Sequence, residues 1–144
     1  MKKAIALLLA LVMVFALCAC GGGGDSASGE KVVKIGVFEP ASGDSGAGGK
    51  KEMLGMQYAN QETPTVEIGG ETYKVELVYS DNGSDSAKAV SAASKLVNEK
   101  VSLVLGSYGS GVSIAASDTF KQAGIPAIGV TCTNPNVTAG NSHY

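Results

Sequence analysis

The pattern of apolar and polar residues is clearest between residues 101 and 133. An apolar run, 101–105, is followed by a Gly/Ser-rich turn, 106–111, and then by apolar positions with the spacing of one helix face. These positions are Val112, Ala115, Ala116, Thr119, Phe120 and Ala123. Gly124 is placed to end that helix, and a second apolar run covers 125–130. The pattern predicts a strand-helix-strand unit of a parallel sheet that is covered on both faces.

An earlier unit begins with the nearly continuous apolar run 31–38, which predicts a central strand. After a loop of small residues, 41–49, the spacing predicts a helix over about 50–61. We expect the inner face of this helix to carry Met53, Leu54, Met56 and Tyr58, with the methionines as core filler.

Between these units, the pattern predicts a hairpin of 66–68 with 72–79, and the alternation in 72–79 indicates a strand near a sheet edge. Asp81 is expected to serve the turn that follows. Ser84, Asp85 or Ser86 can cap the next helix, which runs to about Glu99. Its expected inner face carries Ala89, Val90, Ala93, Leu96 and Val97.

Together these elements predict an α/β protein, a three-layer αβα sandwich with a mainly parallel sheet of flavodoxin-like order 2-1-3-4. The numbers count 31–38, 72–79, 101–105 and 125–130 as the first to fourth strands. In such sheets, ligands bind just beyond the carboxyl ends of the strands.

The N-terminus has the layout of a secretory signal, with two lysines before an apolar stretch, 4–16, that is too short to span a bilayer. The sequence Leu-Cys-Ala-Cys at 17–20 resembles a bacterial lipobox. This resemblance implies that residues 1–19 are removed and that Cys20 becomes a lipidated N-terminus; an ordinary cleaved signal is the alternative. Residues 20–30 are then a glycine-rich tether.

Composition excludes several classes of function. The chain has a formal net charge of −2 and contains no arginine, which argues against nucleic acid as a partner. Of its three cysteines, Cys18 and Cys20 belong to the N-terminal signal, so Cys132 has no partner for a metal cluster or redox pair. We therefore expect no metal and no cofactor.

Three catalytic or nucleotide-binding motifs also fail. The loop 43–51 has the glycine spacing of a P-loop, but Gly49 stands where the essential lysine belongs. His143 is the only histidine, so no catalytic triad can be assembled with it by sequence alone. The glycines of Gly109-Ser110-Gly111 are one position too close for a nucleophile elbow.

The two polar turns of the 101–133 unit are the candidate site. Ser110, flanked by Gly109 and Gly111, begins a helix whose free N–H groups can hold a carboxylate without an arginine. Residues 131–133 add carbonyls, N–H groups and two hydroxyls at the next strand end. Carbonyls can hold an ammonium group, so the pair of turns suits a zwitterion such as a free amino acid. Simple capping is the competing interpretation of such turns.

Four segments carry a resemblance to a known family, namely 34–49, 75–99, 106–117 and 123–138. Their order resembles the substrate-binding lipoproteins of branched-chain amino acid ABC transporters, the Leu/Ile/Val-binding type. The resemblance covers 31–144. It implies a two-lobed clamshell that holds its ligand between the lobes, of which this chain is expected to be a partial N-terminal lobe.

The resemblance also implies roles for single residues. Ser110 matches a serine that contacts the ligand carboxylate, and Thr133 matches a threonine that binds through its N–H and hydroxyl groups. Thr131 matches a position whose backbone meets the ligand ammonium. Cys132 stands where the family usually has Ser or Ala, and residues 47–48 stand where it often has an aromatic residue or Ala.

The function implied is that of a lipid-anchored extracytoplasmic receptor that delivers a small amino acid to ABC permease subunits without chemistry of its own. A clamshell sensor for amides, urea or other amino acids is an alternative. An enzyme or phospho-switch on a flavodoxin-like sheet is a further one, which the turn Gly106-Ser107 disfavours because a receiver needs an aspartate after its third strand.

Overall fold

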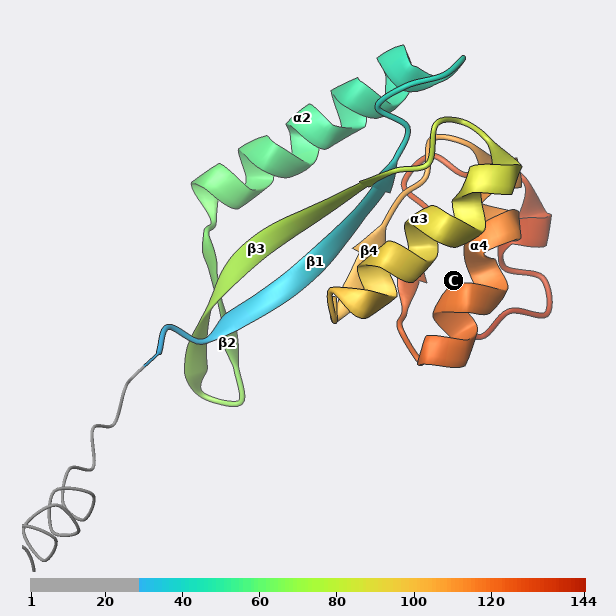
Figure 1. The fold of residues 1–144 in the computed structure, drawn as a ribbon. Helices are drawn as coiled ribbons and strands as arrows, with labels where there is room; N and C mark the ends of the chain where they lie inside the picture. The colour runs from blue at the N-terminus through green and yellow to red at the C-terminus, as the bar shows by residue number, and fades with distance from the viewer. Residues whose placement is uncertain (1–28) are drawn as a thin grey trace, which may run out of the picture.

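The structure is a computed structural model that describes residues 29–144 (Figure 1). The expected signal peptide, the Cys20 lipidation site and most of the tether lie outside the described residues. The strands are β1 (Val32–Glu39), β2 (Thr65–Ile68), β3 (Glu71–Asp81), β4 (Leu103–Leu105) and β5 (Ala127–Ile128). The helices are α2 (Gly46–Glu62), α3 (Ser86–Asn98) and α4 (Ser110–Ala123), followed by the 3-10 turn η1 (Pro135–Val137).

The strands form one sheet in the order β2-β3-β1-β4-β5. β1 is parallel to β3 and β4, β5 is parallel to β4, and β2 pairs antiparallel with β3. This arrangement confirms the predicted order of the four main strands, the central place of the first strand and the hairpin. Figure 1 shows α2 on one side of the sheet and α3 and α4 on the other, which confirms the three layers.

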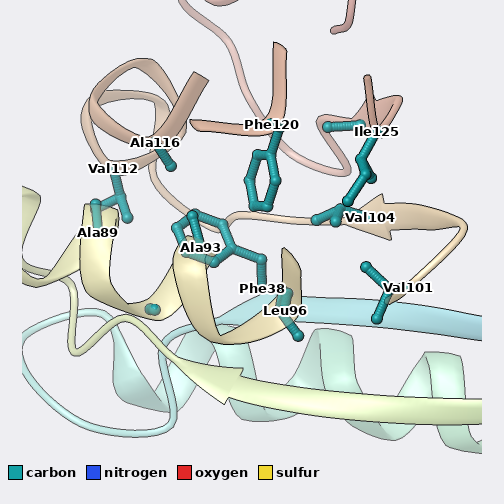
Figure 2. Close-up of a cluster of buried hydrophobic side chains, with 12 residues drawn as sticks. Phe38, Ala89, Ala93, Leu96, Val101, Val104, Val112, Ala116, Phe120 and Ile125 are labelled. Carbon is teal, nitrogen blue, oxygen red and sulfur yellow. The ribbon is translucent and has the colours of Figure 1, made fainter. Parts of the chain in front are cut away.

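Alternate residues of each strand face opposite sides of the sheet. Phe38 of β1 and Val104 of β4 turn toward α3 and α4 and are both 0% exposed. There the Phe38 ring meets the Phe120 ring of α4 edge-on, with centroids 5.5 Å apart and planes at 87°. Figure 2 shows these rings converging with Leu96 of α3 and with alanines that let the two helices approach closely. This cluster is the hydrophobic core of the described residues.

The helix α2 differs from the prediction in its start and in its orientation. It begins at Gly46, before the expected residue 50, because Gly46 and Gly49 pack directly on main chain. A Cβ on Gly49 would lie 2.2 Å from the carbonyl oxygen of Pro40, so only glycine permits this contact. The contact sets the rotation of the helix, and Leu54 and Tyr58 point outward at 63% and 65% exposure. Their predicted place on the inner face is therefore wrong.

Smaller corrections apply to the other elements. Val90 is 48% exposed, because α3 packs through the alanine-rich row at positions 89, 92, 93 and 96 and Val90 lies off that row. Ala123, the last residue of α4, is exposed as well. The fourth predicted strand covers only Ala127–Ile128, so it is shorter than the apolar run 125–130 that predicted it. Gly124 ends α4 in the left-handed conformation (φ 68°), as predicted.

Candidate functional site

The loops that follow β1, β3 and β4 meet at the carboxyl edge of the sheet, where the topology rule places ligands. Asp81, at the end of β3, ties two of these loops together. Its carboxylate accepts the N–H of Ala41 at 2.8 Å, the hydroxyl of Ser42 at 2.7 Å and the N–H of Gly83 at 2.8 Å. Burial opposes ionisation of Asp81, but these hydrogen bonds outweigh it and hold its pKa below the usual value. The structure thus confirms that Asp81 serves the turn.

A buried polar layer lies directly under this edge. The side-chain amide of Asn82 donates to the carbonyl oxygen of Phe38 at 3.2 Å and to the hydroxyl of Ser107 at 3.0 Å. The N–H of Ser107 donates to the hydroxyl of Ser113 at 3.1 Å. Asn82, Ser107 and Ser113 are each 0% exposed, so these bonds join β1, the loop after β4 and α4 without competition from water. The layer fixes the positions of the loops above it.

Glu39, the last residue of β1, is a buried carboxyl group that sequence reasoning missed. It is 1% exposed, and its Oε2 accepts the N–H of Tyr108 at 2.8 Å. Within residues 29–144, its Oε1 and both carboxyl oxygens of the neighbouring Glu52 on α2 lack a hydrogen-bond donor. Burial raises the pKa of Glu39 to about 8, the Tyr108 bond opposes this, and Glu52 adds to it. The buried site therefore favours the protonated form of Glu39.

Gly106 lets the chain pass over Glu39. Its φ is +125°, and a Cβ there would lie 2.2 Å from the carbonyl oxygen of Phe38 and 2.7 Å from Oε1 of Glu39. No other residue fits this position without moving the strand. The glycine at the end of the third apolar run is thus a requirement of the loop that carries the candidate site.

The structure brings the two predicted polar turns together through Ser110. The hydroxyl oxygen of Ser110 accepts the N–H of Thr133 at 3.1 Å and the N–H of Asn134 at 3.2 Å. A hydroxyl group that accepts two bonds can still donate its hydrogen to a third partner. The helix start and the loop after β5 are thus one continuous polar rim.

The N–H groups at the start of α4 differ in part from the expectation. The N–H of Val112, expected to be free, donates to the carbonyl oxygen of Gly109 at 3.1 Å. In residues 29–144, the N–H groups of Ser110 and Gly111 have no such partner and remain at the positive end of the helix.

The remaining predicted residues, Thr131 and Cys132, lie in the loop after β5. The thiol of Cys132 turns inward and lies 3.2 Å from the hydroxyl oxygen of Ser113 and 3.4 Å from the carbonyl oxygen of Ser107. Thr131 is exposed. Because its thiol turns inward, Cys132 can serve a ligand at the rim only through its main chain.

A small cleft of about 240 Å³, which we call the serine cleft, opens between the starts of α2, α3 and α4. It is lined by Pro40, Ser45, Ser84, Ser86, Ser107, Tyr108, Gly109, Gly111 and Val112. A second hollow of about 230 Å³ includes Cys132, Thr133 and Tyr144. Sequence reasoning treated Ser84 and Ser86 only as capping residues and passed over Tyr108. Their shared signal is a position just after a strand, at or before a helix start.

Two kinds of feature are not found in the part of the chain that the structure describes. No three His, Cys, Asp or Glu side chains gather there as a metal-binding group. No helix between residues 29 and 144 has the length and apolar character needed to cross a membrane.

Comparison with known proteins agrees with this geometry. The family model for periplasmic binding proteins matches residues 32–144. The chain belongs to this family. Leu/Ile/Val-binding protein homolog 2 of Brucella abortus (strain 2308) is a relative within it, 33% identical over 106 residues that cover 74% of this chain and 28% of that protein.

Two solved structures of the family have a similar fold. A leucine binding protein of Thermotoga maritima is 35% identical, with a TM-score of 0.71, and the match covers 78% of this chain and 31% of that one. A branched-chain amino acid transporter substrate binding protein of Streptococcus pneumoniae, in complex with isoleucine, is 33% identical with a TM-score of 0.69, over 78% of this chain and 32% of that one. The chain thus spans about a third or less of the length of these relatives.

Proposed function

We propose that this chain contributes one side of an amino-acid receptor, the extracytoplasmic solute-binding component of an ABC importer. The relatives named above are leucine- and branched-chain-binding proteins, which makes a branched-chain amino acid the first candidate ligand. The receptor delivers this ligand to permease subunits and performs no chemistry.

The observation that carries the proposal is the bridge from Ser110 to the loop after β5. Its hydroxyl oxygen is filled by two N–H donors at 3.1 and 3.2 Å, so its hydrogen is left to donate to a carboxylate. The N–H groups of Ser110 and Gly111 stand beside it at the positive end of α4. A ligand carboxylate at this point needs no arginine, and the chain has none.

The ammonium group of the same ligand requires acceptors nearby. Thr131, Cys132 and Thr133 offer main-chain carbonyls, and Thr133 adds a hydroxyl. We assign Gly109 and Gly111 to close approach of the main chain, since they bring no side chain into the serine cleft.

The test is calorimetric titration of the protein expressed from its complete open reading frame with leucine, isoleucine, valine, alanine, acetamide and urea. We expect branched-chain amino acids to bind best. Ser110→Ala should weaken leucine binding at least about tenfold, because it removes a hydrogen bond to a charged group. Ser117→Ala is the matched control, since that hydroxyl lies further along α4 and bonds to the carbonyl oxygen of Ile114 at 2.8 Å. Equal affinity for Ser110→Ala and wild type would refute the assigned role, and a response to urea or acetamide alone would favour the sensor alternative.

We also propose membrane anchoring through Cys20. Mass spectrometry of the protein from its native membrane should find lipid on Cys20 and no residue before it. Cys20→Ala should release the protein from the membrane fraction, whereas Cys18→Ala should not. An unmodified Cys20 in a mature N-terminus would contradict the anchor and leave the amino-acid proposal intact.

A further inference from the structure

The loop after β4 packs on the carboxyl group of Glu39. Oε2 of Glu39 accepts the N–H of Tyr108 at 2.8 Å, and a Cβ on Gly106 would lie 2.7 Å from its Oε1. The side chain of Glu39 is 1% exposed. The course of residues 106–109, which lead directly into Ser110 and α4, therefore depends on this carboxyl group.

The start of α2 meets the same carboxyl group. Gly49 packs on the carbonyl oxygen of Pro40, the residue after Glu39, where an added Cβ would lie only 2.2 Å away. Glu52 follows three positions later, on the same face of α2 as Gly49, and its carboxyl group lies within hydrogen-bonding reach of Glu39. The helix and the loop after β4 thus share Glu39 as a common support.

The two carboxyl groups lack a donor in the part of the chain that the structure describes. There, Oε1 of Glu39 and both carboxyl oxygens of Glu52 are buried without a hydrogen-bond partner. The ion pairs of this part join Lys31, Lys34 and Lys74 to other glutamates. One proton on Oε1 of Glu39 would turn that oxygen into a donor and join the two groups by a hydrogen bond. Burial, and then Glu52, raise the pKa of Glu39 to about 8, which agrees with this geometry.

Two other titratable groups act near Glu39. Asp81 lies beside it in β3; burial opposes ionisation of Asp81, but its hydrogen bonds outweigh this and hold its pKa below the usual value, so it stays ionised. Tyr144 is close enough to respond to the charge of Glu39, and burial raises the pKa of Tyr144 to about 12, so it stays neutral. Of these three groups, Glu39 alone changes charge between neutral and mildly alkaline pH.

We propose that Glu39 is a positioning residue for the candidate site, which as a carboxylic acid donates its hydrogen to Glu52 and holds residues 106–109 in the form that binds the ligand. Loss of the proton leaves two negative charges side by side, which pushes α2 away from β1. The displacement reaches Tyr108, whose ring lies directly on α2, since a Cβ on Gly48 would be 2.6 Å from its Cζ. Ligand binding should therefore decline as pH rises above about 8. The effect on binding rests on the proposed function, but the hydrogen bond does not.

Infrared difference spectra test the hydrogen bond without a ligand, using the protein expressed from its complete open reading frame. At pH 6.5, wild type minus Glu39→Gln should show the carbonyl stretch of a protonated carboxyl group, and at pH 9.5 this band should be gone. In Glu52→Gln the band should disappear at lower pH than in wild type, because the new amide can donate to the ionised Glu39. Glu62→Gln, at the exposed end of the same helix, is the matched control and should keep the wild-type band.

Calorimetric titration with leucine at the same pH values tests the effect on the site. Wild-type affinity should fall about fivefold more than that of Glu39→Gln between pH 6.5 and 9.5. The amide of Glu39→Gln keeps the hydrogen-bonding groups of the protonated acid, since its nitrogen can donate to Glu52 and its oxygen can accept the Tyr108 N–H. Every other titrating group, the ligand ammonium included, is common to both proteins and cancels. Glu62→Gln should show the wild-type decline.

The outcomes separate this inference from the proposed function. If no protonated-carboxyl band distinguishes wild type from Glu39→Gln at pH 6.5, the inference is overturned whatever the ligand does. If the band is present but both proteins lose leucine affinity equally, the positioning role is overturned. If the band behaves as expected and wild type binds no amino acid at any pH, the proposed function fails and the positioning role with it, while the hydrogen bond between Glu39 and Glu52 stands.

Discussion

The two faces of the sheet are made of similar residues but are covered very differently. On the face toward α3 and α4, Phe38, Leu96, Val104 and Phe120 are all 0% exposed. The opposite face, toward α2, carries Val33, Ile35, Val75, Leu77, Leu103 and Leu105, which line an apolar groove of about 750 Å³. These six side chains remain only partly buried.

The difference comes from the helices and not from the strands. α3 and α4 meet the sheet with rows of alanine, leucine and phenylalanine, which fill the space between the layers. α2 turns Glu52, Gly55, Met56 and Ala59 toward the groove, and its only buried residues are Gly46 and Gly49. A nearly continuous apolar strand therefore predicts that both faces of the sheet are covered, but the side chains of the facing helix decide how completely each face is buried.

The largest effect should follow from damage to the covered face. Phe120→Ala should lower the free energy of unfolding by about 3–5 kcal/mol, because it leaves a cavity against Phe38. Urea denaturation followed by circular dichroism measures this loss. A loss below about 1.5 kcal/mol would mean that the core collapses around the gap.

The matched change on the groove face should cost less. Leu77→Ala is expected to lower the free energy of unfolding by about 1–2 kcal/mol, because the leucine already borders an open groove. The same urea titration applies. A cost equal to that of Phe120→Ala would show that the groove face is closed in solution, and the comparison of the two faces would fail.

The carboxyl group at the end of the groove face should make stability depend on pH. The pKa of Glu39 is raised from 4.5 to about 8, so between these values the folded state keeps a proton that the unfolded chain releases. Stability should therefore fall as pH rises from about 4.5 to about 8 and change little from this group above that. Melting temperatures at pH 5, 7 and 9 measure the trend. Glu39→Gln, which keeps an acceptor for the Tyr108 N–H, should flatten it, and an equal slope in this variant would assign the trend to another group.

The smallest effect is expected on the outer side of α2. Leu54→Ala should change the free energy of unfolding by less than about 0.5 kcal/mol, because Leu54 is 63% exposed. Met56→Ala, two positions along the same helix and facing the groove, is the comparison and should cost more. If Leu54→Ala is the more costly of the two, α2 is rotated in solution relative to this structure.

Much of the fold was predictable because local rules and packing agree. Gly124 ends α4 as its spacing predicts, and Asp85, one of the three predicted capping candidates, caps α3, where its carboxylate accepts the N–H of Ala87 at 2.8 Å. The outward turn of Leu54 was not predictable, since it depends on contacts between glycines and main chain far from that residue. The contact of Ser110 with the loop after β5 followed from topology. The N–H of Val112 donates to the carbonyl oxygen of Gly109, so the start of α4 has fewer free N–H donors than expected.

Glu39 and Tyr108 were missed for a physical reason as well. A single carboxyl group at a strand end looks solvated in sequence, whereas in the structure Gly106 packs against Glu39, which is 1% exposed. An acidic residue directly after the buried pair Val37-Phe38 was the available signal. Tyr108 gave only its position between a strand end and a helix start, and its contact with Gly48 could not be read from the sequence.

The double acceptance at Ser110 bears on the cost of capture. With both lone pairs engaged by the loop after β5, the hydroxyl hydrogen of Ser110 is left for one further acceptor. For the ligand carboxylate that we propose at this point, little rotational freedom of the Ser110 side chain remains to be lost on binding. The rim thereby lowers the entropy cost of the carboxylate contact that we propose.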